Sequence, residues 1–299
     1  MVTISPELTL YVAAVAPEVD RLFIAGHRAA RPFAVELSQR LGVISFGPLI
    51  DLRRQLLSLS GMTVQDAHWK QRSTPLDELQ ASLEDGVSRG LLRREASLFT
   101  PTDQGREVLD GLTDALSGGL APLWGNGAEL EQAIQAVEMV IQHAENTLDP
   151  VDYPAFTVEH AGAGVDPSNY PLALWTHLST LRYLRADAHA LAWRPFTETW
   201  PEKILLTGLC YTNGSNRVDV RREESMLIDD GGSTPHFANL EARGWARRTV
   251  DGWEATPAGR LTRRQVEENT NAFNAPPFNA LPDNQRIDLL WVLRELPED

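Results

Sequence analysis

Residues 90–106 read GLLRREASLFTPTDQGR, and residues 244–260 read GWARRTVDGWEATPAGR. The two stretches align without a gap at an offset of 154 residues, so a glycine, an Arg-Arg pair, a threonine and a Gly-Arg pair recur in the same order. Self-similarity at a fixed offset indicates an internal repeat. We therefore predict that the chain carries one structural unit twice.

Each stretch predicts a small β-hairpin followed by a helix. Two short segments flank a turn, and Asp251-Gly252 is a dipeptide favoured in tight hairpins. Thr102 and Thr256 are suited to cap the helix that follows. Upstream, Ser73-Thr74-Pro75 and Ser233-Thr234-Pro235 predict another helix start, with a hydroxyl N-cap and proline at the first helical position. Helix, hairpin and helix in this order form the second part of a winged helix-turn-helix.

At the same offset of 154, Ala121–Trp124 matches Ala275–Phe278. Looser matches, with small insertions, extend the repeat toward the N-terminus and pair Asp51–Arg54 with Asp219–Arg222 and Arg31–Phe33 with Arg194–Phe196. Residues 144–171 are rich in Pro, Gly, Asn and Asp and predict a linker. We place the junction near residue 155, with a first copy over residues 1–155 and a second over 156–299. The predicted fold is mainly α with small β-wings: an internally duplicated winged helix-turn-helix that forms a pseudo-two-fold pair within a single chain.

Three longer helices are predicted outside the repeated stretches. Apolar residues at helical spacing occur over residues 128–147, 172–193 and 282–296. We expect the first and the last of these helices to pack the two copies together.

Composition restricts the classes of function. The net charge of −14 disfavours nonspecific binding to nucleic acid or anionic membranes, although a local basic patch can still bind DNA. The single cysteine, Cys210, excludes an intrachain disulfide, and the seven histidines lack metal-ligand spacing, so we expect no cofactor. The sequence shows no signal peptide and no apolar run of membrane-spanning length, so a cytoplasmic protein without membrane contact is expected.

Two resemblances follow from these motifs. Gly-Leu-Leu-Arg-Arg followed by Thr-x-x-Gly-Arg resembles the recognition helix, wing and following helix of MarR-type transcription regulators, over about residues 50–110 and 217–270. Residues 181–189, LRYLRADAH, resemble the LRxxRGDxH helix of an uncharacterised actinobacterial family of tandem winged-helix proteins, with Ala186 where that family favours glycine. The MarR resemblance implies a transcriptional regulator that binds duplex DNA.

A DNA-reading helix needs Arg, Lys, Asn or Gln on its outer face. The first candidate helix, residues 74–90, carries four acidic residues and only Arg89, whereas the second, residues 234–244, is near neutral. The candidate DNA-binding residues are Asn239 and the paired arginines of both copies: Arg53, Arg54, Arg93, Arg94, Arg221, Arg222, Arg247 and Arg248. The alternative interpretation is that these arginines pair with neighbouring glutamates (Glu95, Glu223 and Glu224) on a solvated surface.

The helix over residues 172–193 suggests a second kind of site. Arg182, Arg185 and His189 fall on one border of its apolar stripe. They could form a pocket for a small anionic ligand, or salt bridges to acidic residues of the other half. The alternative function is therefore a winged-helix protein that does not bind DNA, and instead binds a small anionic ligand or a protein partner between its halves. Phosphate loops, dinucleotide motifs and nucleophile elbows are missing, so an enzyme would depend on His189 alone as proton carrier.

Overall fold

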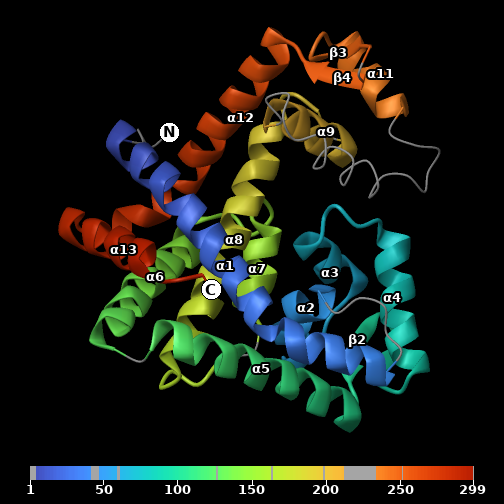
Figure 1. Cartoon of the computed structure of the whole chain (residues 1–299), viewed down its shortest axis with the longest axis vertical. Coiled ribbons are helices and arrows are strands. Elements are labelled where there is room, and N and C mark those ends of the chain that lie inside the picture. Colours follow the sequence, from blue (N-terminus) through green and yellow to red (C-terminus); the bar gives the residue numbers. More distant parts are fainter. Residues whose placement is uncertain are drawn as a thin grey trace. The chain divides into compact units, whose positions relative to one another are not determined.

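The computed structural model describes residues 5–41, 47–58, 61–125, 127–162, 164–197, 199–211, 234–250 and 252–298. These residues form a mostly helical protein with two small antiparallel hairpins (Figure 1). The predicted class, mainly α with small β-wings, is confirmed. Backbone contacts divide the chain into a large unit, Met1–Asp187 with Asn274–Asp299, and a small unit, Ala188–Phe273. The predicted junction near residue 155 is a boundary between repeated copies of the sequence, whereas this division is a boundary between compact units. The junction therefore stays a prediction.

The large unit contains most of the helices. Its elements are α1 (Pro6–Leu41), α2 (Gly47–Leu57), α3 (Val64–Lys70), α4 (Leu76–Ser88), β1 (Leu92–Glu95), β2 (Leu98–Pro101), α5 (Asp103–Trp124), α6 (Ala128–Thr147), α7 (Pro154–His160), most of α8 (Tyr170–Trp193), the 3-10 helix η2 (Pro276–Ala280) and α13 (Asp283–Glu295). The helices predicted over 128–147, 172–193 and 282–296 are confirmed as α6, α8 and α13, within two residues at each end. None of the helices in the described ranges is long and apolar enough to cross a bilayer.

In the large unit, α3 and α4 are joined by a turn and followed by the β1–β2 hairpin, which is the order of elements predicted for a winged helix-turn-helix. Thr63 begins α3 with a capping box, in which its hydroxyl accepts from the Asp66 amide while the Asp66 carboxylate accepts from the Thr63 amide. Met62, just before this cap, pairs with Phe99 of β2 through two backbone hydrogen bonds of 3.0 and 2.8 Å. The wing is therefore tied directly to the start of the helix-turn-helix.

One predicted cap differs from the structure. Helix α4 begins at Leu76, and Pro75 occupies the cap position with no side-chain hydrogen bond. Thr74 instead donates its backbone N–H to the Gln71 carbonyl at 2.9 Å, which closes the turn after α3. The threonine therefore belongs to the turn between the helices, and the first helical position lies one residue later than predicted.

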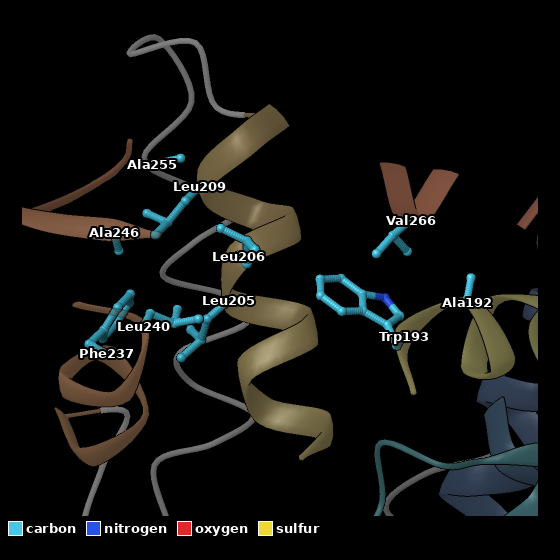
Figure 2. Packing of buried hydrophobic residues seen from close by; sticks show 10 residues of the cluster. All are labelled: Ala192, Trp193, Leu205, Leu206, Leu209, Phe237, Leu240, Ala246, Ala255 and Val266. Atoms are coloured by element: carbon cyan, nitrogen blue, oxygen red, sulfur yellow. The ribbon is translucent and has the colours of Figure 1, made fainter. Parts of the chain in front are cut away.

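The small unit contains the second hairpin and its flanking helices. Its elements are the end of α8, α9 (Trp200–Tyr211), α11 (Thr234–Ala242), β3 (Ala246–Thr249), β4 (Gly252–Ala255) and α12 (Pro257–Asn274). Figure 2 shows Leu205 of α9 turned toward Leu240 of α11, and Leu209 of α9 turned toward Ala246 of β3. Phe237 also stacks on Trp253 of β4, with ring centroids 5.0 Å apart. This apolar core fixes the hairpin and α11 against α9.

The two predicted threonine caps are confirmed, and their contacts recur 154 residues apart. Thr102 donates its hydroxyl to the Gly90 carbonyl at 2.6 Å and accepts from the Gly105 amide at 3.1 Å. Thr256 makes the equivalent two bonds at 2.6 and 3.0 Å. Gly90, like its counterpart, has a φ of 71°, a left-handed conformation that glycine adopts without strain. Each threonine thus joins the end of one helix to the start of the next.

The glycine three residues after each threonine cap lies against a backbone carbonyl. A Cβ atom on Gly105 would come within 1.9 Å of the Leu91 carbonyl oxygen, and a Cβ on Gly259 within 2.1 Å of that of Trp245. Only glycine allows α5 and α12 to approach the chain this closely. The Gly-Arg pairs in the sequence therefore mark a point of tight packing.

The segment predicted as a linker contains a helix with a buried charge. Helix α7 lies within residues 144–171, and its Glu159 is only 1% exposed. The carboxylate accepts from Arg54 at 2.7 Å, from Gln55 at 3.2 Å and from the ammonium group of Lys70. Burial opposes ionisation of Glu159, but Lys70 and Arg54 outweigh it and hold the pKa of this carboxyl at about 2. The linker prediction missed this helix, because a helix of seven residues is too short to show a helical period in the sequence.

A second buried carboxylate reinforces the same region. Asp187 of α8 accepts from the Phe156 amide at 2.8 Å, in the first turn of α7, and pairs with Arg72, which follows α3. Burial raises the pKa of Asp187 to about 6, against the lowering effects of Arg72 and of the Phe156 amide. Its contribution to stability therefore declines as pH rises from 3.8 to about 6.

Replacing Glu159 tests the buried cluster. We expect Glu159→Gln to lower the free energy of unfolding at neutral pH by about 3–5 kcal/mol, because Lys70 and Arg54 would lose their counter-charge. The depressed pKa of Glu159 makes its contribution complete above 4.5 and lost as pH falls toward about 2. Urea unfolding measured across this window should therefore show a weaker pH dependence in the variant. Glu145→Gln, at an exposed pair with His160, is the control; an equal effect there would refute the assignment.

The glycine contacts give a second test. We expect Gly105→Ala and Gly259→Ala each to destabilise the unit that contains it by about 1–3 kcal/mol, because the methyl group would overlap a backbone carbonyl. Gly118→Ala is the matched control, since Gly118 lies in α5 with no atom within 4 Å of the position that a Cβ would take, and it should be neutral or stabilising by up to ~1 kcal/mol. Thermal and chemical denaturation measure the stability of these variants against that of the wild type. If alanine at positions 105 and 259 changed the stability no more than alanine at position 118, the close approach of these glycines to a backbone carbonyl would be contradicted.

Candidate nucleic-acid interface

The wing of the large unit exposes two arginines that have partners nearby. Arg93 donates to the Thr100 hydroxyl at 2.9 Å and lies 3.6 Å from the Glu95 carboxylate. Arg94 pairs with Glu84 of α4. In this wing the contacts agree with the interpretation that the arginines form ion pairs on a solvated surface.

Helix α4, which takes the recognition position in the large unit, is acidic. The acidic residues of this helix are Asp77, Glu78, Glu84 and Asp85. Arg89, at its C-cap, donates to the Asp85 carboxylate at 2.6 Å. A helix with this excess of negative charge would be repelled by DNA phosphates. The large unit therefore offers a helix-turn-helix with unfavourable electrostatics for DNA.

In the small unit, α11 is near neutral, because it carries the acidic Glu241 and is followed directly by Arg243. Asn239 is exposed and donates through Nδ2 to the buried carboxylate of Glu202 at 3.0 Å. Arg243, after the end of α11, lies 3.6 Å from the same carboxylate and donates to the Phe196 carbonyl at 2.8 Å. Thr197 donates its hydroxyl to Glu202 at 2.7 Å. Glu202 of α9 thus orients Asn239 and Arg243, the two polar side chains at the C-terminal end of α11.

The second wing adds two exposed guanidinium groups. Arg247 of β3 is 68% exposed and pairs with Glu254 across the hairpin. Arg248, its neighbour on β3, is also exposed. Arg243 and Arg247 each lie beside a carboxylate, as the arginines of the first wing do, and the three guanidinium groups lie on consecutive elements, the end of α11 and the wing.

The first predicted arginine pair is buried. Arg53 is 2% exposed and its guanidinium lies 4.9 Å from the centre of the Trp175 ring, while Arg54 binds Glu159. These side chains stabilise the interior of the large unit, so we omit them from the candidate interface. The corresponding pair, Arg221 and Arg222, lies outside the described residues, as does Asp251 of the predicted turn dipeptide.

The residues of the predicted anionic-ligand site have separate intramolecular roles. Arg182 lies 3.2 Å from the Asp20 carboxylate and 4.5 Å from the centre of the Phe23 ring. Arg185 is half-buried in the same unit. The anionic-ligand alternative gains no support from these contacts.

His189 has both ring nitrogens engaged in the small unit. Trp193 donates its indole N–H to Nε2 at 2.9 Å, and Nδ1 lies 3.1 Å from the Thr270 hydroxyl. That hydroxyl gives its own proton to the Val266 carbonyl at 2.7 Å. Nδ1 must therefore be the donor to Thr270, which assigns the neutral tautomer with the proton on Nδ1. The contacts describe a structural link between α8 and α12.

Two residues around the small-unit surface, Glu202 and Arg243, were not among the DNA-binding candidates of the sequence. Glu202 stands in an apolar helix and gave no signal. Arg243 could have been found, because it lies 154 residues after Arg89 and directly before the repeated glycine.

Replacing His189 tests its structural role. We expect His189→Ala to lower the free energy of unfolding by about 1–3 kcal/mol, because the buried Trp193 indole N–H would lose its acceptor. The indole ¹H–¹⁵N resonance of Trp193, assigned with Trp193→Phe, should shift as that hydrogen bond is lost. His143→Ala, on α6, is the control and should change neither quantity. An unshifted Trp193 resonance in His189→Ala would contradict the assigned bond.

Comparison with known proteins adds one finding. A model of a helix-turn-helix family matches residues 119–298, which is more than half of the chain. No curated protein and no solved structure matches.

Proposed function

The chain belongs to this helix-turn-helix family, and we propose that it is a MarR-like transcriptional regulator that binds duplex DNA through its small unit. Membership of such a family suggests that the chain binds DNA, without indicating which surface is used. The proposal adds which surface is used and that this surface belongs to the second copy of a duplicated winged helix-turn-helix. The threonine caps, glycine contacts and hairpins that recur at an offset of 154 residues support the duplication.

Charge is distributed unequally along the chain. Residues 188–273, the span of the small unit, contain eleven Lys and Arg against twelve Asp and Glu, whereas the whole chain has 27 against 41. The rest of the chain therefore carries nearly all of the net charge of −14. An approaching duplex would meet the least repulsion at the small unit.

The observation that carries the proposal is the contrast between the two recognition positions. The C-terminal end of α11 and its wing present Asn239, Arg243, Arg247 and Arg248 beside the single carboxylate of α11, Glu241, where α4 presents four carboxylates. Asn239 uses one N–H toward Glu202, which leaves its second N–H and its Oδ1 for the edge of a base, the pairing that asparagine makes with adenine. The arginines would contact phosphates and set the orientation.

The test compares the two wings in matched variants. We expect Arg247→Gln/Arg248→Gln to weaken binding to a labelled mixed-sequence duplex by about tenfold and to reduce the slope of log K against log salt by about 2, one for each lost phosphate contact. Arg93→Gln/Arg94→Gln, the equivalent change in the large unit, should leave both quantities unchanged. Fluorescence anisotropy over a salt series measures both, with circular dichroism to verify folding. Equal losses in the two variants, or no duplex binding by the wild type, would refute the proposal.

A further inference from the structure

A cavity of about 240 Å³ lies within the large unit, between α2, α4, β1 and α5. Its wall is mainly aliphatic and includes Leu52, Leu56, Leu79, Leu83, Val108 and Leu109. An apolar cavity of about 150 Å³ holds a benzene ring, and pockets for drug-sized molecules begin near 300 Å³. The space therefore suits a molecule of one or two fused rings.

The charged residues that line the cavity lie on α4 or at its C-cap and are exposed, while Gln71 and Thr74 line it from the turn before α4. Asp85 and Arg89 form an ion pair of 2.6 Å, so their charges largely compensate each other. Glu78 is exposed, and its carboxylate has no ion-pair partner among the described residues. The mouth therefore carries one uncompensated negative charge.

We propose that this cavity binds a small aromatic amine, with the ring among the leucines and the ammonium group at Glu78. The aliphatic wall favours the ring by removing its surface from water. The charge at the mouth selects a cation and disfavours an anion. The site lies in the large unit, on α4, and so does not depend on the DNA surface assigned to the small unit.

The first experiment compares three probes that share one ring system. The full chain, labelled with ¹⁵N, is titrated with tryptamine (cationic), indole (neutral) and indole-3-propionate (anionic). We expect saturable shifts of backbone amides in α4 and α5 with tryptamine, in the millimolar range typical of fragments. Indole should bind more weakly and indole-3-propionate weakest. Shifts confined to other elements, no saturable shift with tryptamine, or equal binding of the cation and the anion would overturn the proposal.

The second experiment uses two neighbouring carboxylates of α4. Glu78→Gln should weaken tryptamine binding by about fivefold, the scale of one exposed ion pair, and leave indole binding unchanged. Asp77→Asn removes an equal charge from the same helical turn, but Asp77 does not line the cavity, so tryptamine binding should stay near wild type. Equal losses in both variants would show a general effect of helix charge and would overturn the assignment of Glu78.

A third variant occludes the mouth. Ser82→Trp places a large ring at an exposed lining position and should abolish binding of tryptamine and indole alike. Wild-type binding in a Ser82→Trp protein that melts at the wild-type temperature would overturn the cavity as the site.

Discussion

The large unit depends on the neutralisation of one buried carboxylate. Glu159 lies in the interior, where an isolated charge would be prohibitively costly, and Lys70 and Arg54 supply the opposite charge. Because these partners come from α3 and α2, the short helix α7 is bound to the first helices of the winged helix-turn-helix. Asp187 and Arg72 add a second link, from α8 to the turn that precedes α4. The orientation of the helix-turn-helix is therefore set by charge pairs within the interior.

In both halves, one threonine and one glycine position the wing. The threonine does so by hydrogen bonds, and the glycine does so because it has no Cβ atom. The threonine hydroxyl bridges the end of the recognition-position helix and the start of the next helix, and the following glycine lets that helix approach a backbone carbonyl. These contacts are made to backbone atoms and do not depend on the charge of the surface side chains. The two halves can therefore keep the same local geometry while α4 is acidic and the surface of α11 and its wing is neutral to basic. The two hairpin regions thus share a local geometry and differ in surface charge.

Much of the fold could be predicted from local pattern. Hairpins, threonine caps and the long helices α6, α8 and α13 follow from turn dipeptides, cap residues and apolar spacing, which act within a few residues along the chain. The candidate site was predictable only in part. Arg247, Arg248 and Asn239 are exposed, as a DNA-contacting role requires, whereas Arg53 and Arg54 form the same Arg-Arg motif and are buried. Identical dipeptides in sequence thus have different surroundings in the fold.

The sequence by itself determined the hairpins, the threonine caps, the helices α6, α8 and α13, the recurrence at 154 residues and the contrast in charge between α4 and α11, because each is a property of neighbouring residues. Only the tertiary structure decided which charges are paired and which face solvent. Glu159 meets Lys70 across 89 residues, and Asp187 meets Arg72 across 115. His189, a candidate proton carrier by pattern, is held by Trp193 and Thr270. The physical reason is that burial and ion pairing depend on distance in space, which local periodicity does not record.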